Sequence, residues 1–211
     1  MEERMEEHLT FPVGDISLEG LFSTPQDTPQ IGAILCHPHP LYGGEMRNNV
    51  VSALADTFQK AGIATLRFNF RGVGQSGGQH GEGEAELEDV KAAVTALLDR
   101  QAVSQVVVTG YSFGSMVGLR AGANDGRVHT LIGVAFPMGF RDPSFLLDVT
   151  KPTLLISGDR DEYAPLPDLT DFFSKMREPK QLEIIAGADH FFMVQTSEVA
   201  KAALAFLQKE T

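Results

Sequence analysis

The sequence predicts an α/β fold in which a mostly parallel sheet opens with an antiparallel hairpin and carries helices on both faces. Strand-like apolar runs alternate along the chain with segments of helical periodicity, a pattern typical of parallel βαβ units. The connections are short, and no internal repeat is visible. Of the 211 residues, 43% are hydrophobic, which is enough for one substantial core. We expect a single domain over 1–211, with residues 1–7 as a flexible tail.

The antiparallel hairpin is expected over residues 8–13 and 16–24, with a Gly14-Asp15 turn between its strands. A proline-rich break at 24–29 ends it. Parallel strands are then expected at 31–36, 63–70, 105–109, 129–135, 153–157 and 181–185, and helices at 49–61, 84–100, 113–121, 169–176 and 197–208. Because few residues separate the strands at 129–135 and 153–157, no sizeable cap domain is expected over the sheet.

The composition argues against several classes of partner and location. A formal net charge of −11 repels phosphate backbones and anionic lipid surfaces, so neither a nucleic acid nor a membrane is expected as a partner. The acidic residues 1–7 lack the apolar core of a signal peptide, and no apolar run is long enough to span a bilayer. Cys36 is the single cysteine, which excludes an internal disulfide. A cytoplasmic protein is expected.

The most informative motif is GYSFG at 110–114, which places Ser112 between two glycines, after a strand-like run and before a helix-forming segment. That context is the signature of a nucleophile elbow. GQSGG at 74–78 fits the same G-x-S-x-G pattern around Ser76. Ser76 does not follow a strand, however, and the glycine-rich residues after it are a poor start for a helix. We therefore interpret Ser112 as the nucleophile of a hydrolase.

A serine hydroxyl needs a neighbouring base and a carboxylate that orients the base. In serine hydrolases of this type the acid and then the histidine follow the serine in the chain. His129 begins an expected strand and so lies at the wrong edge of the sheet, whereas His190 follows the strand at 181–185. His190 is therefore the expected base. The turn at 157–165 contributes three carboxylates, and Asp142 is the alternative acid.

An acyl-transfer site also needs two N–H donors for the tetrahedral oxyanion. Phe113, directly after the serine, is expected to provide one, and the loop at 36–44 the other. Pro38 and Pro40 have no N–H to donate, which leaves His39 as the best donor and Leu41 as the next.

Two competing motifs imply other ligands. His37 and His39 form a His-x-His pair that could share a metal ion, but no nearby ligand in the sequence completes such a site. GVGQSG at 72–77 matches a dinucleotide-binding pattern and follows a strand, but the next helix does not open on its glycines. Neither a metal nor another cofactor is expected.

Five motifs together resemble the small, lidless bacterial α/β-hydrolases related to dienelactone hydrolase: HPHPLYGG at 37–44, LRFNFRGVGQSG at 66–77, GYSFG at 110–114, GDRD at 158–161 and ADH at 188–190. The resemblance covers nearly the whole chain from about Phe11 onward. It implies an α/β-hydrolase fold. In the Gly-Asp-x-Asp turn of that superfamily the second aspartate orients the histidine, which assigns the role to Asp161 and leaves Asp159 to bond backbone groups. It also places His39 at the oxyanion-donor position.

The serine at the elbow differs from the nucleophile that two related groups of enzymes have at this position. Dienelactone hydrolase itself has a cysteine nucleophile, so Ser112 argues against its lactone substrate. Haloalkane dehalogenases of this superfamily need an aspartate there. The motifs are specific for the fold and the triad but not for a substrate. The leading interpretation is an enzyme that hydrolyses small-molecule carboxylic esters of small or medium acyl groups through an acyl-enzyme on Ser112. A thioesterase or peptidase with the same triad, and a catalytically silent binding protein of this fold, are the alternatives.

Several side chains near the expected strand ends are candidates for an apolar acyl pocket, although ordinary packing would explain about half of them. Cys36 is expected to be a buried core residue rather than a second nucleophile. The pocket candidates are Tyr42, Phe136, Met138, Phe140, Phe191, Phe192 and Met193.

Overall fold

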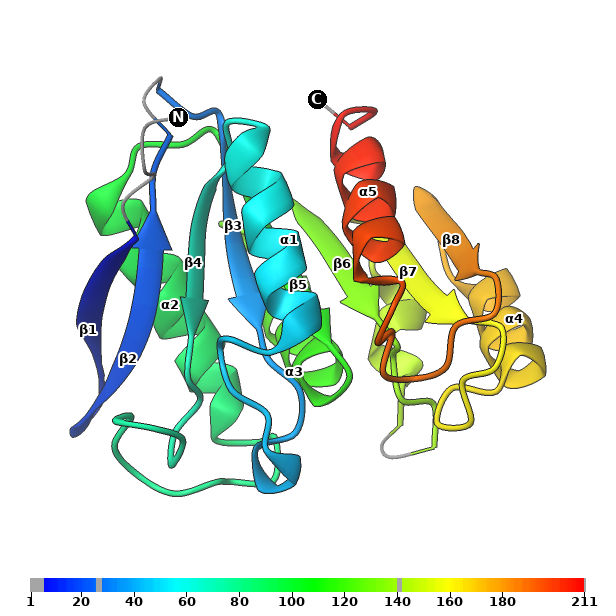
Figure 1. Ribbon diagram of the computed structural model, residues 1–211, viewed down its shortest axis with the longest axis horizontal. Helices are drawn as coiled ribbons and strands as arrows, with labels where there is room; N and C mark the ends of the chain where they lie inside the picture. Colours follow the sequence, from blue (N-terminus) through cyan, green and yellow to red (C-terminus); the bar gives the residue numbers. More distant parts are fainter. Residues whose placement is uncertain (1–5, 26–27, 140–141, 211) are drawn as a thin grey trace.

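The computed structural model describes residues 6–25, 28–139 and 142–210, and eight strands within them form one sheet in the order β1-β2-β4-β3-β5-β6-β7-β8 (Figure 1). β1 pairs antiparallel with β2, and β2 with β4, while all other neighbours are parallel. The predicted fold class is confirmed. The strands are β1 (Glu7–Val13), β2 (Ile16–Ser23), β3 (Ile31–Cys36), β4 (Ala64–Phe68), β5 (Gln105–Tyr111), β6 (Thr130–Val134), β7 (Thr153–Gly158) and β8 (Lys180–Ile185).

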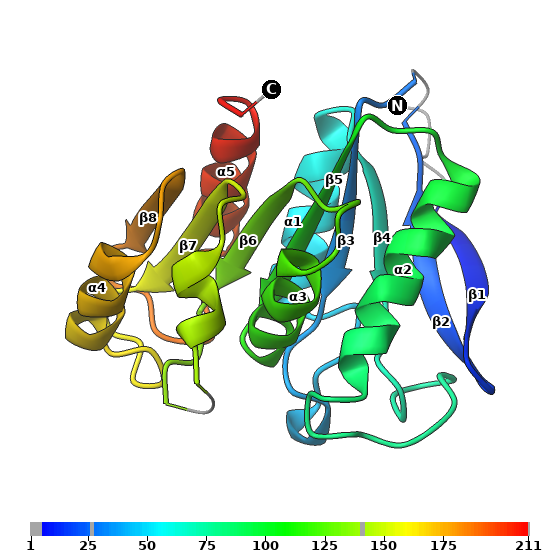
Figure 2. The same ribbon diagram turned by 180° about the vertical axis from the view of Figure 1, so that it is seen from behind.

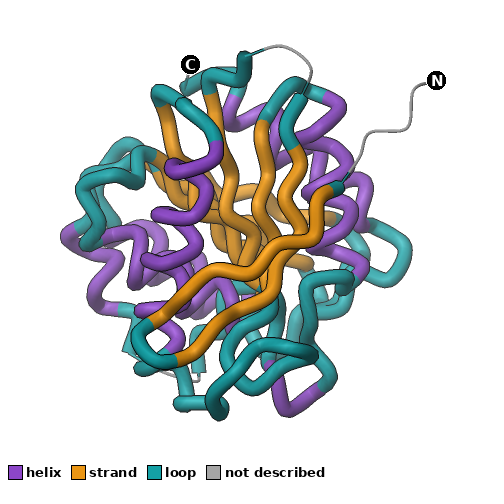
Figure 3. The backbone as a smooth tube through the Cα atoms, turned by 90° about the vertical axis from the view of Figure 1, so that its left-hand side faces the viewer, coloured by secondary structure: helices purple, strands orange, loops and turns teal. Residues whose placement is uncertain are grey.

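Helices cover both faces of the sheet, as Figure 3 shows from the β1–β2 edge. α1 (Asn49–Lys60) and α5 (Thr196–Leu207) lie on the face toward the viewer in Figure 1. α2 (Glu86–Arg100), α3 (Phe113–Ala123) and α4 (Leu166–Lys175) lie on the opposite face (Figure 2). Two short 3-10 helices, η1 (Pro40–Tyr42) and η2 (Ser144–Asp148), follow β3 and β6. In the described residues between β6 and β7, η2 is the only helix, so the sheet carries no large cap.

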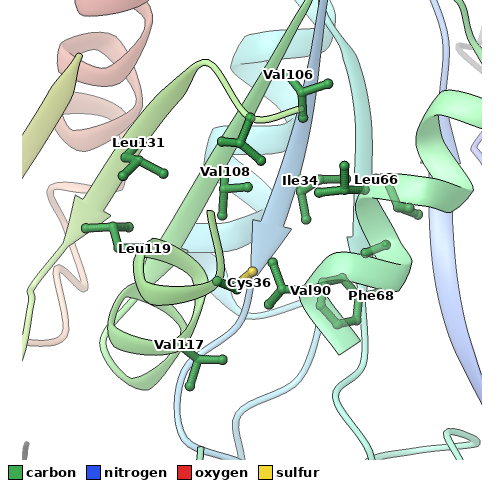
Figure 4. Close-up of a cluster of buried hydrophobic side chains, with 14 of the residues drawn as sticks. Ile34, Cys36, Leu66, Phe68, Val90, Val106, Val108, Val117, Leu119 and Leu131 are labelled. Atoms are coloured by element: carbon green, nitrogen blue, oxygen red, sulfur yellow. The ribbon is translucent and has the colours of Figure 1, made fainter. Parts of the chain in front are cut away.

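The central strands are buried on both faces, which explains why they read as continuous apolar runs. On the α2–α3 face, Ile34, Val108 and Phe68 pack against Val90 and Val117 (Figure 4). On the other face, the alternate strand residues pack against α1 and α5. This double packing holds the carboxyl ends of the parallel strands as a rigid base for the loops that follow them.

The largest boundary difference is at α4, which begins at Leu166 rather than at the expected residue 169. Pro167 lies in its first turn, where the missing N–H of proline is not needed by the helix.

The N-terminal segment is tied to the sheet from Glu6 onward. Both carboxylate oxygens of Glu6 accept hydrogen bonds from Arg67 Nη2 at 2.7 Å, and β1 begins at Glu7. Residues 1–5 of the expected tail lie outside the described residues. No helix in the described ranges has the length and apolar character that a bilayer crossing requires.

Candidate active site

The loops at the carboxyl ends of the parallel strands surround a cavity of about 980 Å³. These ends lie at the lower edge of the sheet in Figure 1. The residues after β3, β5, β7 and β8 all contribute to the cavity wall, as expected for a parallel sheet whose site forms beyond its carboxyl ends. Ser112 and His190 both line it.

The turn from β5 to α3 holds Ser112 in a backbone conformation that L-residues rarely adopt, with φ of 55° and ψ of −119°. The Ser112 N–H donates to Val134 O at 2.8 Å, which ties the turn to β6. A Cβ atom on Gly110 would overlap the backbone of Gly114, and one on Gly114 would overlap the carbonyl oxygens at the end of β3. Both flanking positions therefore require glycine.

Ser112, His190 and Asp161 form a continuous chain of short contacts. Ser112 Oγ lies 2.9 Å from His190 Nε2, and His190 Nδ1 lies 2.8 Å and 3.0 Å from the two oxygens of Asp161. The Asp161 side chain is fully buried and that of His190 is 10% exposed. With the Nδ1 proton directed at the carboxylate, Nε2 presents a lone pair to the serine hydroxyl.

The carboxylate of Asp161 is held by backbone donors as well as by His190. Its Oδ1 accepts hydrogen bonds from Tyr163 N at 2.8 Å and Ala164 N at 3.0 Å. These bonds fix the orientation of the carboxylate toward the imidazole. The ring of Tyr163 packs on the His190 ring, with centroids 4.6 Å apart.

The rejected alternatives lie elsewhere or bond other groups. His129 is exposed, and its Nδ1 accepts from Val106 N near the start of β5. Asp142 accepts from Ser144 N and Oγ beside η2. The hydroxyl of Ser76 is buried and donates to Asn69 O at 2.7 Å.

Asp159 ties the acid loop to the histidine loop. It lies next to the Asp161 turn, and its Oδ1 accepts from Gly187 N at 2.7 Å. The Arg160 N–H donates to Ala188 O at 3.0 Å. Asp159 therefore bonds a backbone N–H and holds the loop after β8, which carries His190, in place.

The N–H groups of Phe113 and His39 are available near Ser112. Within the described residues neither donates to another protein group, and both residues line the cavity. The N–H of Leu41, the second choice from sequence, instead donates to His39 Nδ1 at 3.2 Å. The geometry therefore favours His39 over Leu41 as the second oxyanion donor.

His37 anchors the loop that carries His39. Its Nδ1 lies 2.7 Å from Pro38 O, and its Nε2 accepts from Phe70 N at 3.0 Å, so the proton is on Nδ1. Burial lowers the pKa of His37 to about 4. Both ring nitrogens are engaged, which removes His37 from a metal pair with His39. No group of three potential metal ligands occurs in the part of the chain that the structure describes.

Five of the seven pocket candidates do not line the cavity or lie outside the described residues. Tyr42 and Phe191 line the cavity. Phe136 and Phe192 are buried in the core, Met138 packs against it, and Met193 is exposed without lining the cavity. Phe140 lies outside the described residues. Cys36 is buried, which raises the pKa of its thiol far above the ordinary range and suits a core residue.

Sequence reasoning missed two contacts at the site. The Tyr111 hydroxyl donates to His190 O at 2.8 Å, so the residue before the nucleophile bonds the main chain of the base. His80 lines the cavity with its Nδ1 2.8 Å from the carboxylate of the fully buried Glu86. The only signal for the second contact in the sequence is the acidic first turn of α2, which includes Glu86.

Comparisons with known proteins agree with this architecture. Residues 34–206 match the family model of the alpha/beta hydrolase domain. An uncharacterized protein of Rickettsia prowazekii is 32% identical over 179 residues, which cover 81% of this chain and 75% of that protein. An alpha/beta serine hydrolase homologue from Coxiella burnetii has 31% identity and a TM-score of 0.89, over 98% of this chain and 100% of that one.

A structure from Xanthomonas campestris described as an α/β serine hydrolase without a lid is similar to the same extent. It has 30% identity and a TM-score of 0.87, over 99% of this chain and 96% of that one. Est1E from Butyrivibrio proteoclasticus, solved with ferulic acid bound, has 20% identity and a TM-score of 0.83, which supports the fold alone. With a serine elbow, an uncapped parallel sheet and a family match over most of its length, the chain belongs to the alpha/beta hydrolase family.

Proposed function

We propose that this protein is a serine hydrolase that cleaves carboxylic esters of small or medium acyl groups through an acyl-enzyme on Ser112. The observation that carries the proposal is the chain of contacts from Ser112 Oγ through His190 to Asp161 at the wall of the cavity. In this role Ser112 is the nucleophile, His190 the base, and Asp161 the group that orients it.

In the acylation step, Ser112 Oγ attacks the ester carbonyl carbon while its proton moves to His190 Nε2. The carbonyl oxygen becomes an oxyanion, which the N–H groups of Phe113 and His39 stabilise by hydrogen bonds. When the tetrahedral intermediate collapses, the bond to the alcohol oxygen breaks. His190 Nε2 gives its proton to that oxygen, and the alcohol leaves.

In the deacylation step, water takes the place of the alcohol. His190 Nε2 removes a proton from the water as its oxygen attacks the acyl carbonyl, and the same two N–H groups stabilise the second oxyanion. Collapse breaks the bond to Ser112 Oγ, which recovers its proton from His190. The carboxylic acid leaves, and no group besides substrate, water and these side chains is consumed.

The cavity supports the proposed size of the acyl group. Its volume of about 980 Å³ is at the upper end of ordinary small-molecule sites. Phe113, Met116, Tyr163 and Phe191 provide apolar walls close to Ser112. Since the described residues include no large cap, the cavity is open to solvent on one side, and long acyl chains would be left partly exposed to water.

A fluorophosphonate probe, which reacts with activated serines, tests the proposal directly. We expect the wild-type chain and Ser76→Ala to be labelled, and Ser112→Ala to be unlabelled and inactive on an ester panel of graded acyl length. The Ser76→Ala variant is the matched control because it removes the serine of the second G-x-S-x-G motif. Labelling at Ser76, or a wild-type chain without labelling or ester turnover, would contradict the proposal.

The role of His190 has its own test. His190→Ala should lower kcat by about 10³-fold or more, because the serine hydroxyl loses its base. Its circular dichroism spectrum should match that of the wild type. Turnover at the wild-type rate would remove His190 from the mechanism.

A further inference from the structure

Two imidazole rings that the proposed mechanism does not use lie beside each other in the cavity wall. His39 and His80 both line the cavity that contains Ser112, and their ring centroids are 5.1 Å apart. Each ring also packs on Phe113, at 4.9 Å and 5.4 Å respectively. The pair therefore adjoins the residue directly after the proposed nucleophile.

The protonation of the His39 ring follows from its neighbour. The Leu41 N–H donates to Nδ1 at 3.2 Å, so Nδ1 carries a lone pair rather than a proton. Burial lowers the pKa of His39, which keeps the ring neutral at neutral pH. Its single proton is then on Nε2, which is a hydrogen-bond donor and has no partner among the described residues.

The His80 ring has the opposite arrangement. Its Nδ1 lies 2.8 Å from Oε1 of the fully buried Glu86, although the contact is not aligned as an ideal hydrogen bond. A lone pair at that distance from a carboxylate would be repelled, so the proton is on Nδ1. Glu86 is itself fixed, because it accepts from Gly81 N at 2.7 Å and Gly83 N at 2.8 Å. A His80 ring with one proton thus offers Nε2 as an acceptor.

We propose that His39 and His80 form a subsite for a hydroxyl group of the substrate. His39 Nε2–H donates to the hydroxyl oxygen, and the hydroxyl hydrogen is donated to His80 Nε2. Two hydrogen bonds of about 2.8 Å to one oxygen span at most about 5.6 Å between the two ring nitrogens. Rings whose centroids lie 5.1 Å apart can place their Nε2 atoms within that span. The inference rests on the proposed function and names its substrate class: esters that carry a free hydroxyl in the acyl or the alcohol part.

A carboxylate fits the pair less well than a hydroxyl. It has no proton to donate to His80 Nε2, and it would approach the buried Glu86 and the cavity-lining Glu82 in a chain with a net charge of −11. An alkyl group in the same position would leave one donor and one acceptor without partners. Both mismatches cost binding free energy that a hydroxyl avoids.

Matched ester pairs test the subsite. One series compares propionyl with lactyl esters of the same alcohol, and the other compares propyl with hydroxypropyl esters of the same acid. For each pair, the ratio of kcat/KM values is divided by the ratio of the rates of hydroxide-catalysed hydrolysis. We expect a corrected ratio of about ten or more in favour of the hydroxylated ester in one of the series. The series that shows it tells whether the acyl or the alcohol part occupies the subsite.

The variants are compared by the same corrected ratio of kcat/KM values. General damage to the enzyme lowers kcat/KM for both esters of a pair, so it does not change their ratio. His80→Leu should bring the ratio to about one. His8→Leu, which makes the same change on an exposed position of β1, should keep the wild-type ratio. A wild-type ratio of about one in both series, or an unchanged ratio in His80→Leu, would overturn the subsite.

A second measurement needs no variant. Nitrogen-15 NMR of the wild-type imidazoles at pH 8 should show His39 protonated on Nε2 and His80 protonated on Nδ1. The opposite tautomer of either ring would also overturn the proposal. Fluorophosphonate labelling separates the two levels of inference: a chain labelled at Ser112 with no hydroxyl preference contradicts only the subsite, whereas a chain without labelling contradicts the proposed function.

Discussion

The Tyr111 hydroxyl donates a hydrogen bond to the backbone carbonyl oxygen of His190 at 2.8 Å. Tyr111 is 3% exposed, and burial raises the pKa of its hydroxyl, which therefore remains protonated and able to donate. The last residue of β5 thus joins the nucleophile turn to the loop that carries the base. We expect the spacing between Ser112 and His190 to depend on this bond as well as on their direct contact.

Tyr111→Phe should therefore reduce activity without touching the reacting atoms. The His190 carbonyl would lose a buried donor, which costs about 1–3 kcal/mol of the free energy of unfolding. A less firmly held imidazole should lower kcat by about 5- to 50-fold, with little change in KM. Steady-state kinetics and urea unfolding measure the two effects.

Thr109→Val is the matched control for Tyr111→Phe. It deletes a buried hydroxyl two residues earlier on β5, and within the described residues that hydroxyl has no hydrogen-bond partner. We expect unchanged kinetics and an unchanged or higher free energy of unfolding. If Tyr111→Phe behaves like Thr109→Val, the bond to His190 has no positioning role.

Asp161→Asn should abolish most activity by reversing the imidazole tautomer. The two N–H groups that donate to Asp161 Oδ1 would select the amide oxygen of asparagine and turn its NH₂ group toward His190 Nδ1. His190 would then carry its proton on Nε2 and could not accept the Ser112 proton. The same substitution in a well-studied serine protease lowers kcat by about 10⁴-fold, and we expect about 10³- to 10⁴-fold here.

Asp159→Asn distinguishes this tautomer effect from simple loss of a carboxylate in the same turn. Asp159 accepts from Gly187 N, and an amide oxygen can continue to do so. Its kcat should stay within a few-fold of the wild type. Equal losses in Asp159→Asn and Asp161→Asn would mean that the turn as a whole matters, rather than the contact with His190.

The three residues of the proposed triad could be found from sequence because each follows a strand of the parallel sheet. Ser112, Asp161 and His190 come after β5, β7 and β8, and the carboxyl ends of parallel strands meet at one edge. Chain order and strand position were sufficient for Ser112 and His190, whereas the choice of Asp161 among the carboxylates of its turn came from the resemblance to the Gly-Asp-x-Asp turn. The central strands could also be found from the sequence, because their burial on both faces makes each of them a continuous apolar run.

The direction of individual loop side chains could not be found in the same way. Phe136 follows β6, but Ala135 before it has a φ of 48°. The chain therefore turns away from the strand at this point, and the alternation of side chains between the two faces of a strand no longer predicts where Phe136 points. Phe136 enters the core, while His80, from a glycine-rich loop distant in sequence, lines the cavity. Such orientations depend on the backbone path of the loops and on contacts between segments far apart in the chain.

Gly114→Ala should disrupt the elbow although it adds only one methyl group. The new Cβ would overlap the carbonyl oxygens of Cys36 and His37, which are backbone atoms that cannot rotate away. We expect a loss of about 3 kcal/mol or more in the free energy of unfolding and a displaced His39 N–H. Gly126→Ala is the control, because a Cβ there meets no atom within 4 Å. Similar unfolding midpoints for the two variants would contradict the steric account of this glycine.

The buried His37 predicts how stability changes in mild acid. Its pKa is about 4 in the folded protein and near 6.5 when unfolded, so the unfolded chain binds a proton first as the pH falls. The stabilisation is complete above pH 6.5 and is lost progressively toward pH 4. Between pH 7.5 and 5.5 the wild type should lose about 1.3 kcal/mol more of its free energy of unfolding than His37→Gln, which has no titrating group at this position. Urea unfolding at the two pH values measures the difference, and equal losses would show that His37 is protonated as readily in the folded chain as in the unfolded one.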